Sequence, residues 1–330
     1  MGGAALERLL ADASAFRVVA LVRPSAKNKR WARRWQRRCR REGPGSLEVI
    51  WGDLCNFEDV LAGVTGAAYV LHVGGMVSPM ADHYPQQTLK VNVSAARNIV
   101  RAVQAQPHPD AIKVVNIGSV AEYGDRNPPH HWGSVADPLC PVDTDVYAQS
   151  KVQAERLFME SGLTYWVSLR QSGMIHPNLL DKALDPITFH VPMQGVLEWA
   201  TAEDSGQLMA NVCQPWVPDS FWGRCYNISS GPSFRLTNLE FERYLLRALH
   251  CPPPEKIFDM AWFAQDHFHG MWYSDGQELE DILHFRANVP CEAYFKAFSK
   301  RLPWYISLAR LVPAFVIKGV MHRVYVNRDK

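Results

Sequence analysis

Short apolar runs alternate with stretches of helical periodicity along the first half of the chain. The runs occupy residues 16–22, 47–51, 67–73, 112–117 and 164–169. Continuous apolar runs of this length are typical of strands that are buried on both faces of a parallel sheet, with helices crossing between them. The alternation therefore predicts an α/β fold with a doubly wound parallel sheet and right-handed crossovers.

Small and polar residues follow several of these runs. Asp53 comes after the second run, Gly74 and Gly75 close the third, and Ser119 lies just beyond the fourth. In open parallel sheets, ligands bind beyond the carboxyl ends of the strands. We therefore expect a binding site at this edge of the sheet.

A tyrosine and a lysine stand four residues apart in the helical stretch after the fourth run. Tyr147 and Lys151 share one helix face, and Ser119 precedes Tyr147 by 28 residues. A nearby ammonium favours the phenolate and lowers the tyrosine pKa from about 10. With Ser119 donating a hydrogen bond to the same substrate oxygen, Tyr147 could act as general acid or base while a nicotinamide exchanges a hydride.

The order of these segments resembles the extended short-chain dehydrogenase/reductase family, of the NAD-dependent epimerase/dehydratase type, over about residues 3–250. The segments that carry the resemblance are Gly52-Asp53-Leu54, Val70–Gly75, Val91-Asn92-Val93, Asn116–Gly124, Tyr147 with Lys151, Leu169–Met174 and Glu203-Asp204. The resemblance implies a Rossmann-like fold and a catalytic trio of Ser119, Tyr147 and Lys151. It also implies cofactor contacts from Gly3, Asp53, Leu54, Gly74, Gly75, Lys151, Gln171 and Met174.

The chain departs from the family pattern at its start. Members of the family open with a strand and a Gly-x-x-Gly-x-x-Gly loop, whereas only Gly3 matches the last glycine here. We therefore expect a sheet that lacks its first strand, and an N-terminally truncated chain.

The residues after the first apolar run bear on the choice of cofactor. NAD sites usually carry an acid at this point, but this chain has Arg23, Lys27 and Lys29 and no acid before Glu42. Arg23 could clamp a 2′-phosphate together with either lysine. The sequence favours NADP over NAD.

The overall charge and the cysteines exclude several classes of protein. The net charge is only +2, so we expect no nucleic-acid partner, and the basic stretch 27–41 is predicted to be a solvated helix. Seven cysteines without a CxxC spacing indicate reduced thiols in a cytoplasmic protein, and we expect no metal site. No signal peptide is predicted.

The second half of the chain is less regular and aromatic-rich. We predict a dinucleotide-binding domain over 1–170 with returning segments at about 196–230. Residues 171–195 and 231–330 are expected to form a smaller, mostly helical substrate lobe. The apolar stretch 304–321 is short for a bilayer span. It is predicted to be a packed or substrate-lining helix, with peripheral membrane contact as the alternative.

These patterns predict an NAD(P)-dependent oxidoreductase acting on a secondary alcohol or ketone of a small-molecule substrate, with an apolar or steroid-like molecule suiting the aromatic lobe. Two alternatives stay open: a nucleotide-sugar epimerase or dehydratase, for which Glu122 is a candidate acid without an assigned place, and a non-catalytic dinucleotide-binding or scaffold protein. Helices 88–104 and 146–161 are expected to pair in a homodimer.

Overall fold

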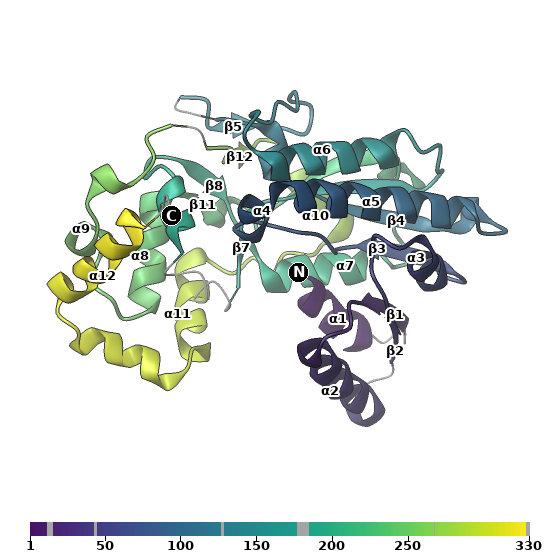
Figure 1. Cartoon of the computed structure of the whole chain (residues 1–330), viewed down its shortest axis with the longest axis horizontal. Coiled ribbons are helices and arrows are strands. Elements are labelled where there is room, and N and C mark those ends of the chain that lie inside the picture. Colours follow the sequence, from purple (N-terminus) through teal and green to yellow (C-terminus); the bar gives the residue numbers. More distant parts are fainter. Residues whose placement is uncertain (12–15, 43–44, 127–128, 177–184, 267, 328–330) are drawn as a thin grey trace.

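A four-stranded parallel sheet forms the centre of the molecule (Figure 1). The structure is a computed structural model that describes residues 1–11, 16–42, 45–126, 129–176, 185–266 and 268–327. The sheet has the order β10-β6-β4-β3, and all three pairings are parallel. Its strands are β3 (Tyr69–His72), β4 (Lys113–Ser119), β6 (Trp166–Gln171) and β10 (Arg224–Ile228).

Helices cover both faces of this sheet. On one face, α3 (Phe57–Val64), α5 (Pro85–Gln104) and α6 (Val146–Met159) bury a cluster with Val114 of β4. On the other face, α1 (Gly2–Ala11), α7 (Ala202–Asn211) and α10 (Gly276–Leu283) enclose a second cluster, which contains Val115 and Val167. The predicted doubly wound α/β fold is confirmed.

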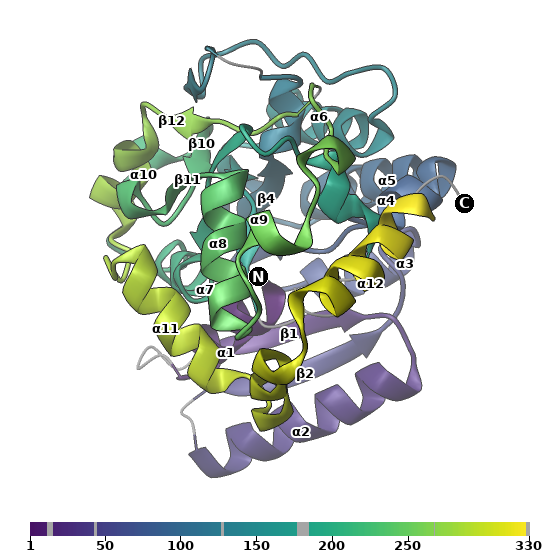
Figure 2. The ribbon, with the colours of Figure 1, turned by 90° about the vertical axis from the view of Figure 1, so that its left-hand side faces the viewer.

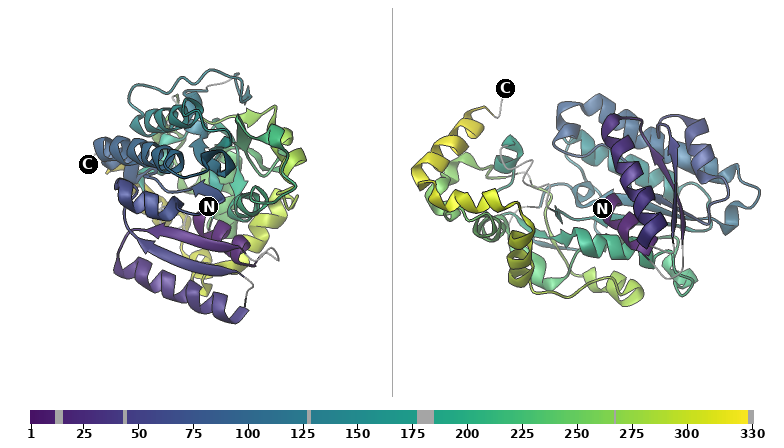
Figure 3. Two further views of the ribbon diagram at one scale, coloured as in Figure 1. Left: turned by 90° about the vertical axis from the view of Figure 1, so that its right-hand side faces the viewer. Right: turned by 90° about the horizontal axis from the view of Figure 1, so that it is seen from below.

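A second, two-stranded sheet stands beside the first. It consists of β1 (Arg17–Val22) and β2 (Ser46–Trp51), which pair in parallel, and α2 (Ala26–Glu42) lies along its outer side (Figures 2 and 3). Strands β1 and β3 contribute side chains to the same two clusters, yet no described strand pairs with the second edge of either one. The prediction of a sheet without its first strand is therefore confirmed.

Close helix packing holds the start of the chain against this core. Helix α1 lies on α7, where a Cβ at Gly206 would come within 2.8–2.9 Å of Ala4. Glycine at 206 lets the two helix backbones approach, so α1 stays on the face of the sheet that it shares with α7. The amino end of α1 reaches β7 (Met174–Ile175), where the Met1 amine lies 3.2 Å from the Met174 sulfur.

The remaining elements form a mostly helical lobe with three small sheets. Its longer helices are α8 (Asn238–Ala248), α11 (Cys291–Arg301) and α12 (Ala314–Val326). Its short elements are α9 (Pro254–Ile257), β5 (Trp132–Gly133), β8 (Val196–Glu198), β9 (Ala200–Thr201), β11 (Arg235–Thr237) and β12 (Trp272–Tyr273). The short helix α4 (Met80–His83) packs on α5 and α6 instead. The small sheets pair β11 with β8, β12 with β5 and β7 with β9. The predicted domain boundaries remain a prediction.

Candidate active site

The carboxyl end of β4 holds Ser119 rigidly. Ser119 is the last residue of β4 and caps a short 3₁₀ helix, η2 (Val120–Tyr123). Its hydroxyl accepts a hydrogen bond from the Ala121 amide at 3.2 Å, and its own amide donates to Glu122 Oε1 at 2.6 Å. This reciprocal capping box fixes the serine at the edge of the sheet where the sequence predicts a binding site.

Tyr147 and Lys151 lie on α6, directly beside this serine. Asp145 caps α6 by accepting a hydrogen bond from the Ala148 amide at 2.8 Å, so Tyr147 stands in the first turn. The side chain of Ser119 lies close enough to the Tyr147 hydroxyl to lower its pKa. The Lys151 amine lies 6.0 Å from the centre of the Tyr147 ring and donates to the Ile117 carbonyl at 2.8 Å. The fold thus brings the three predicted catalytic residues together.

The electrostatics of the tyrosine differ from the expectation based on sequence. Burial raises the pKa of Tyr147 to about 12, while the nearby Ser119 side chain lowers it. The carboxylates of Glu122, Asp145 and Asp82 raise it further. The Lys151 ammonium is not among its main determinants, and burial lowers the pKa of Lys151 itself. Tyr147 is therefore a proton donor at neutral pH in this state of the protein.

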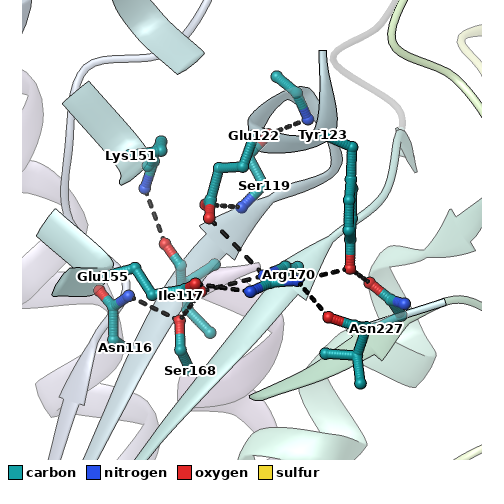
Figure 4. Close-up of polar contacts among 12 residues, drawn as sticks. Asn116, Ile117, Ser119, Glu122, Tyr123, Lys151, Glu155, Ser168, Arg170 and Asn227 are labelled. Atoms are coloured by element: carbon teal, nitrogen blue, oxygen red, sulfur yellow. Dashed lines mark hydrogen bonds and ion pairs between the residues drawn. The ribbon is translucent and has the colours of Figure 1, made fainter. Parts of the chain in front are cut away.

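A buried ionic network lies behind the trio (Figure 4). Arg170 on β6 donates to both oxygens of Glu155, at 2.7 and 3.2 Å, and to the Tyr123 hydroxyl at 2.8 Å. Ser168 donates to Glu155 at 2.7 Å, and Tyr123 donates to Asn227 at 2.7 Å. Because Glu155 is on α6 and Tyr123 ends η2, Arg170 ties the tyrosine helix to the segment that positions Ser119.

Glu122, which the sequence left without a place, belongs to this network. It is fully buried, and its second oxygen, Oε2, lies 3.7 Å from Arg170 and has no hydrogen-bond partner. Burial, and then the charge of Glu155, raise the pKa of Glu122 well above its usual value. Sequence reasoning missed Arg170 and Glu155 as well. The available signals were a charge inside an apolar strand and a carboxylate one turn after Lys151.

The predicted glycines lie beside the lysine. A Cβ on Gly75 would come within 3.0 Å of Asn92 Oδ1 and 3.9 Å of the Lys151 amine, and one on Gly74 would clash with Leu54 at 2.7 Å. Asn92 is fixed by hydrogen bonds with the Met76 backbone and the Ser150 hydroxyl. The loop after β3 therefore presents bare backbone next to Lys151.

The other predicted cofactor residues are spread along the same edge. Gly3 lies in the first turn of α1, where open space surrounds the position of an added Cβ. Met174 contacts the chain's amino group, and Gln171 accepts a hydrogen bond from Ser205 at 3.2 Å. Asp53 follows β2 and accepts from the Cys55 amide at 2.8 Å, and Arg23 is exposed after β1.

This set of groups fits a dinucleotide better at one end than at the other. The Lys151 amine has three N–H donors, one of which goes to Ile117, so two remain for ribose hydroxyls beside the bare Gly74-Gly75 backbone. At the opposite end, Gly2 and Gly3 leave the start of α1 open, and a helix start of this kind suits a phosphate. The nicotinamide end of the site is the more completely built.

Three aspartates lie near Tyr147 or His269. Asp82 and Asp145 lie close enough to Tyr147 to raise the pKa of its phenol. Burial lowers the pKa of His269, whereas the charges of Asp145, Asp125 and Asp82 raise it. His190 and His83 lower the pKa of Asp82, which burial raises. We call Asp82, Asp125 and Asp145 the acidic rim. Among the described residues, no three His, Cys, Asp or Glu side chains are arranged to hold a metal ion.

Comparison with known families shows which family the protein belongs to. The model of the NAD dependent epimerase/dehydratase family matches residues 1–178, more than half of the 330 residues. The chain belongs to this family. The resemblance inferred from the sequence is thereby confirmed.

Within the curated proteins, this epimerase/dehydratase family member matches 3 beta-hydroxysteroid dehydrogenase type 7. The human protein is 29% identical over 119 residues, which are 36% of this chain and 32% of the relative. The Mus musculus protein is 27% identical over 119 residues, with the same coverage. The matched region thus spans about a third of the length of these relatives.

Solved structures of the family share the fold at low identity. A dTDP-glucose 4,6-dehydratase from Bacillus anthracis in complex with NAD has a TM-score of 0.65 and 14% identity, covering 89% of each chain. A UDP-glucuronic acid 4-epimerase from Bacillus cereus, in complex with UDP-glucuronic acid and NAD, has a TM-score of 0.65 and 15% identity, covering 92% of this chain and 95% of the other. Both hold NAD, so the comparisons do not support the predicted preference for NADP.

Proposed function

We propose that the protein is a nicotinamide-dependent oxidoreductase that interconverts a secondary alcohol and a ketone. The observation that carries this proposal is the proximity of Ser119 and Tyr147 at the carboxyl edge of the sheet, with Lys151 one helical turn further on. Bound at this edge, a nicotinamide dinucleotide would supply the hydride chemistry.

The three residues would divide the work on the substrate oxygen. Tyr147 gives its proton to the oxygen of a ketone during reduction, because a pKa of about 12 keeps the phenol protonated at neutral pH. Ser119, held by its capping box, donates a hydrogen bond to the same oxygen. Lys151 binds ribose hydroxyls of the cofactor with the two N–H donors that the Ile117 carbonyl does not use.

The acidic rim supports an uncharged substrate. Asp82, Asp125 and Asp145 would repel the diphosphate of a nucleotide sugar. Two partly buried arginines are neutralised within the chain, Arg126 by Asp137 at 2.7 Å and Arg235 by Glu198 at 2.8 Å. An apolar, ring-shaped alcohol such as a sterol is the substrate class that this charge pattern favours, and the hydroxysteroid dehydrogenase relatives agree with it.

The nucleotide-sugar alternative has weaker support. The solved structures of that class are alike in fold only, at 14–15% identity. Glu122, its candidate acid, is buried in the network of Arg170 and caps Ser119 through the serine amide. For the cofactor, we propose NAD as the first candidate, with NADP as the alternative that Arg23 leaves open.

Turnover by the protein and by Tyr147→Phe tests this function. Nicotinamide absorbance is followed with NAD or NADP against hydroxysteroids, simple secondary alcohols and nucleotide sugars. We expect activity on the apolar alcohols and a loss of about 10²–10⁴-fold in Tyr147→Phe, since general acid–base catalysis contributes that much. Tyr165→Phe is the matched control, because Tyr165 lies before β6, at the opposite end of the strands.

Retained activity in Tyr147→Phe would rule out the proton-transfer role. A cofactor that binds, seen by quenching of tryptophan fluorescence, without turnover on any substrate would favour a non-catalytic dinucleotide-binding protein. Faster turnover of a nucleotide sugar than of any sterol would replace the apolar substrate with the alternative class.

A further inference from the structure

The last described elements expose an unusual amount of apolar surface. The 3₁₀ helix η8 (Trp304–Leu311) and α12 meet at a bend of 109°. We call residues 304–326 the C-terminal apolar segment. Its exposed large hydrophobic side chains are Trp304, Tyr305, Leu308, Leu311, Val312, Phe315, Val316, Val320 and Val326. Three of them, Trp304, Leu311 and Phe315, are 71–77% exposed.

Helix α12 is apolar on two sides. On its inner side, Met321, Ile317 and Tyr325 join a buried cluster of the lobe. On its outer side, Phe315, Val316 and Val320 face away from that cluster and remain exposed. The predicted packed helix is therefore only half correct. Exposed apolar patches of this kind mark interaction sites in folded proteins.

The charge of the segment identifies the kind of partner. The C-terminal apolar segment contains three basic residues, Arg310, Lys318 and Arg323, and no aspartate or glutamate. Arg310 is exposed between the exposed Leu308 and Leu311 of η8, and Arg323 is exposed on α12. Basic side chains among exposed Trp, Tyr, Leu and Phe match the anionic headgroups and adjacent acyl chains of a phospholipid leaflet.

We propose that the C-terminal apolar segment docks the protein on the surface of an anionic phospholipid bilayer. The segment lies in the interface and does not cross the membrane. Among the described residues, no single helix combines the length and apolarity needed to cross a bilayer, and η8 and α12 meet that test only together, across their bend. The basic charge disfavours a second copy of the same surface as the partner, because like charges would face each other.

The segment belongs to the part of the lobe that borders the acidic rim. Tyr325 of α12 packs edge-on against Phe189 at 5.6 Å, and Phe189 lies in η4 (Pro186–His190). His190, the last residue of η4, is close enough to Asp82 to lower its pKa. The docking surface therefore lies on the same part of the lobe as Phe189 and His190, and the docking proposal does not depend on the enzymatic one.

Flotation with vesicles tests the proposal on the full chain. Vesicles of phosphatidylcholine alone are compared with vesicles that also contain phosphatidylserine. We expect binding to the anionic vesicles, and weaker binding at high salt because ions screen the basic residues. Arg310→Glu and Arg323→Glu should each lower the partition coefficient roughly fivefold or more, since each basic residue near such a surface contributes about that factor.

The apolar contribution is tested with a triple variant and a matched control. Trp304→Ser, Leu311→Ser and Phe315→Ser together should abolish flotation with anionic vesicles. Their side chains are exposed, so thermal unfolding should change little. Trp216→Ser is the control, because Trp216 is 49% exposed but lies outside the segment, and this variant should bind vesicles like the unaltered protein.

Four results would overturn the proposal. One is the absence of flotation with anionic vesicles, and another is flotation that the triple variant retains. The third is bound protein that resists extraction by alkaline carbonate, which would show a spanning segment instead of an interfacial one. Sedimentation velocity without vesicles addresses a second copy: a dimer that the triple variant dissolves would assign the surface to self-association, also against the proposal.

Discussion

The four-stranded sheet and the β1–β2 sheet look alike in sequence but differ in their surroundings. Six of the seven residues of β4 and four of the six residues of β6 are buried, whereas β1 and β2 contain no buried residue. Yet Arg17–Val22 is at least as apolar as Lys113–Ser119. Apolarity therefore predicts that a segment is a strand, but the number of neighbours on either side decides how deeply that strand is buried.

Polar residues show the same contrast. The buried strands carry Asn116, Ser168, Arg170 and Asn227, and each is engaged in the network behind the active site. The charged residues of the two-stranded sheet, Arg17 and Glu48, pair in solvent. A buried polar group must find a partner, because burial without one is costly. The polar side chains of the four-stranded sheet are therefore held in fixed hydrogen bonds, whereas the exposed ones of the two-stranded sheet need no protein partner.

A pair of arginine substitutions tests this contrast most strongly. Arg170→Met leaves Glu155 buried without its counter-ion, so we expect a loss of about 3–5 kcal/mol in the free energy of unfolding. Arg17→Met is the matched change in the two-stranded sheet. Because the Arg17–Glu48 pair is 74% and 52% exposed, its loss should cost less than about 1 kcal/mol.

Chemical denaturation of both variants provides the measurement. Adding Glu155→Gln to Arg170→Met should recover part of the loss, since the uncompensated charge is then removed. Equal costs for the two arginines would mean that the two sheets are equally sensitive to lost ion pairs, and the contrast would fail.

Acid sensitivity is the second test. His72 at the end of β3 is buried, and burial lowers its pKa to about 3, with a smaller contribution from Lys151. In the unfolded chain, the imidazole of His72 takes up a proton below a pH of about 6.5. In the folded chain, the same imidazole stays neutral at this pH. Stability is therefore full at neutral pH and falls as the pH drops, by about 2 kcal/mol between pH 7 and pH 5 from this residue.

Unfolding of His72→Gln at several pH values isolates this contribution. The variant should lose less stability on acidification than the unaltered protein, and the two should differ by a constant amount above neutral pH. Parallel pH profiles across the whole range would show that His72 is not the source of the acid sensitivity.

The smallest expected effect concerns Arg23 at the end of β1. If its guanidinium binds a 2′-phosphate, Arg23→Asp should change the ratio of kcat/KM for NADP and NAD by about tenfold in favour of NAD. A change of this size corresponds to the free energy that one charge-assisted hydrogen bond contributes. Steady-state kinetics with both cofactors measure the ratio, and Lys29→Asp on the exposed start of α2 provides a comparison. An unchanged ratio in Arg23→Asp would reject the phosphate clamp.

Much of the candidate site was accessible from the sequence. The i, i+4 spacing of Tyr147 and Lys151 places both on one turn of α6, and the end of an apolar run places Ser119 at the edge of the sheet. These positions follow from local periodicity. The partners of Arg170 could not be predicted in this way, because Glu155 and Tyr123 come from two other elements that only meet in the folded chain.

The sequence by itself determined the order of strands and helices and the residues at the carboxyl edge, because these depend on local pattern. Tertiary structure decided the protonation of Tyr147, whose pKa reflects burial and the carboxylates around it more than the nearby lysine. It also decided which face of α12 is left exposed. Both depend on which groups distant parts of the chain bring together and how much water they exclude, and no local pattern encodes that.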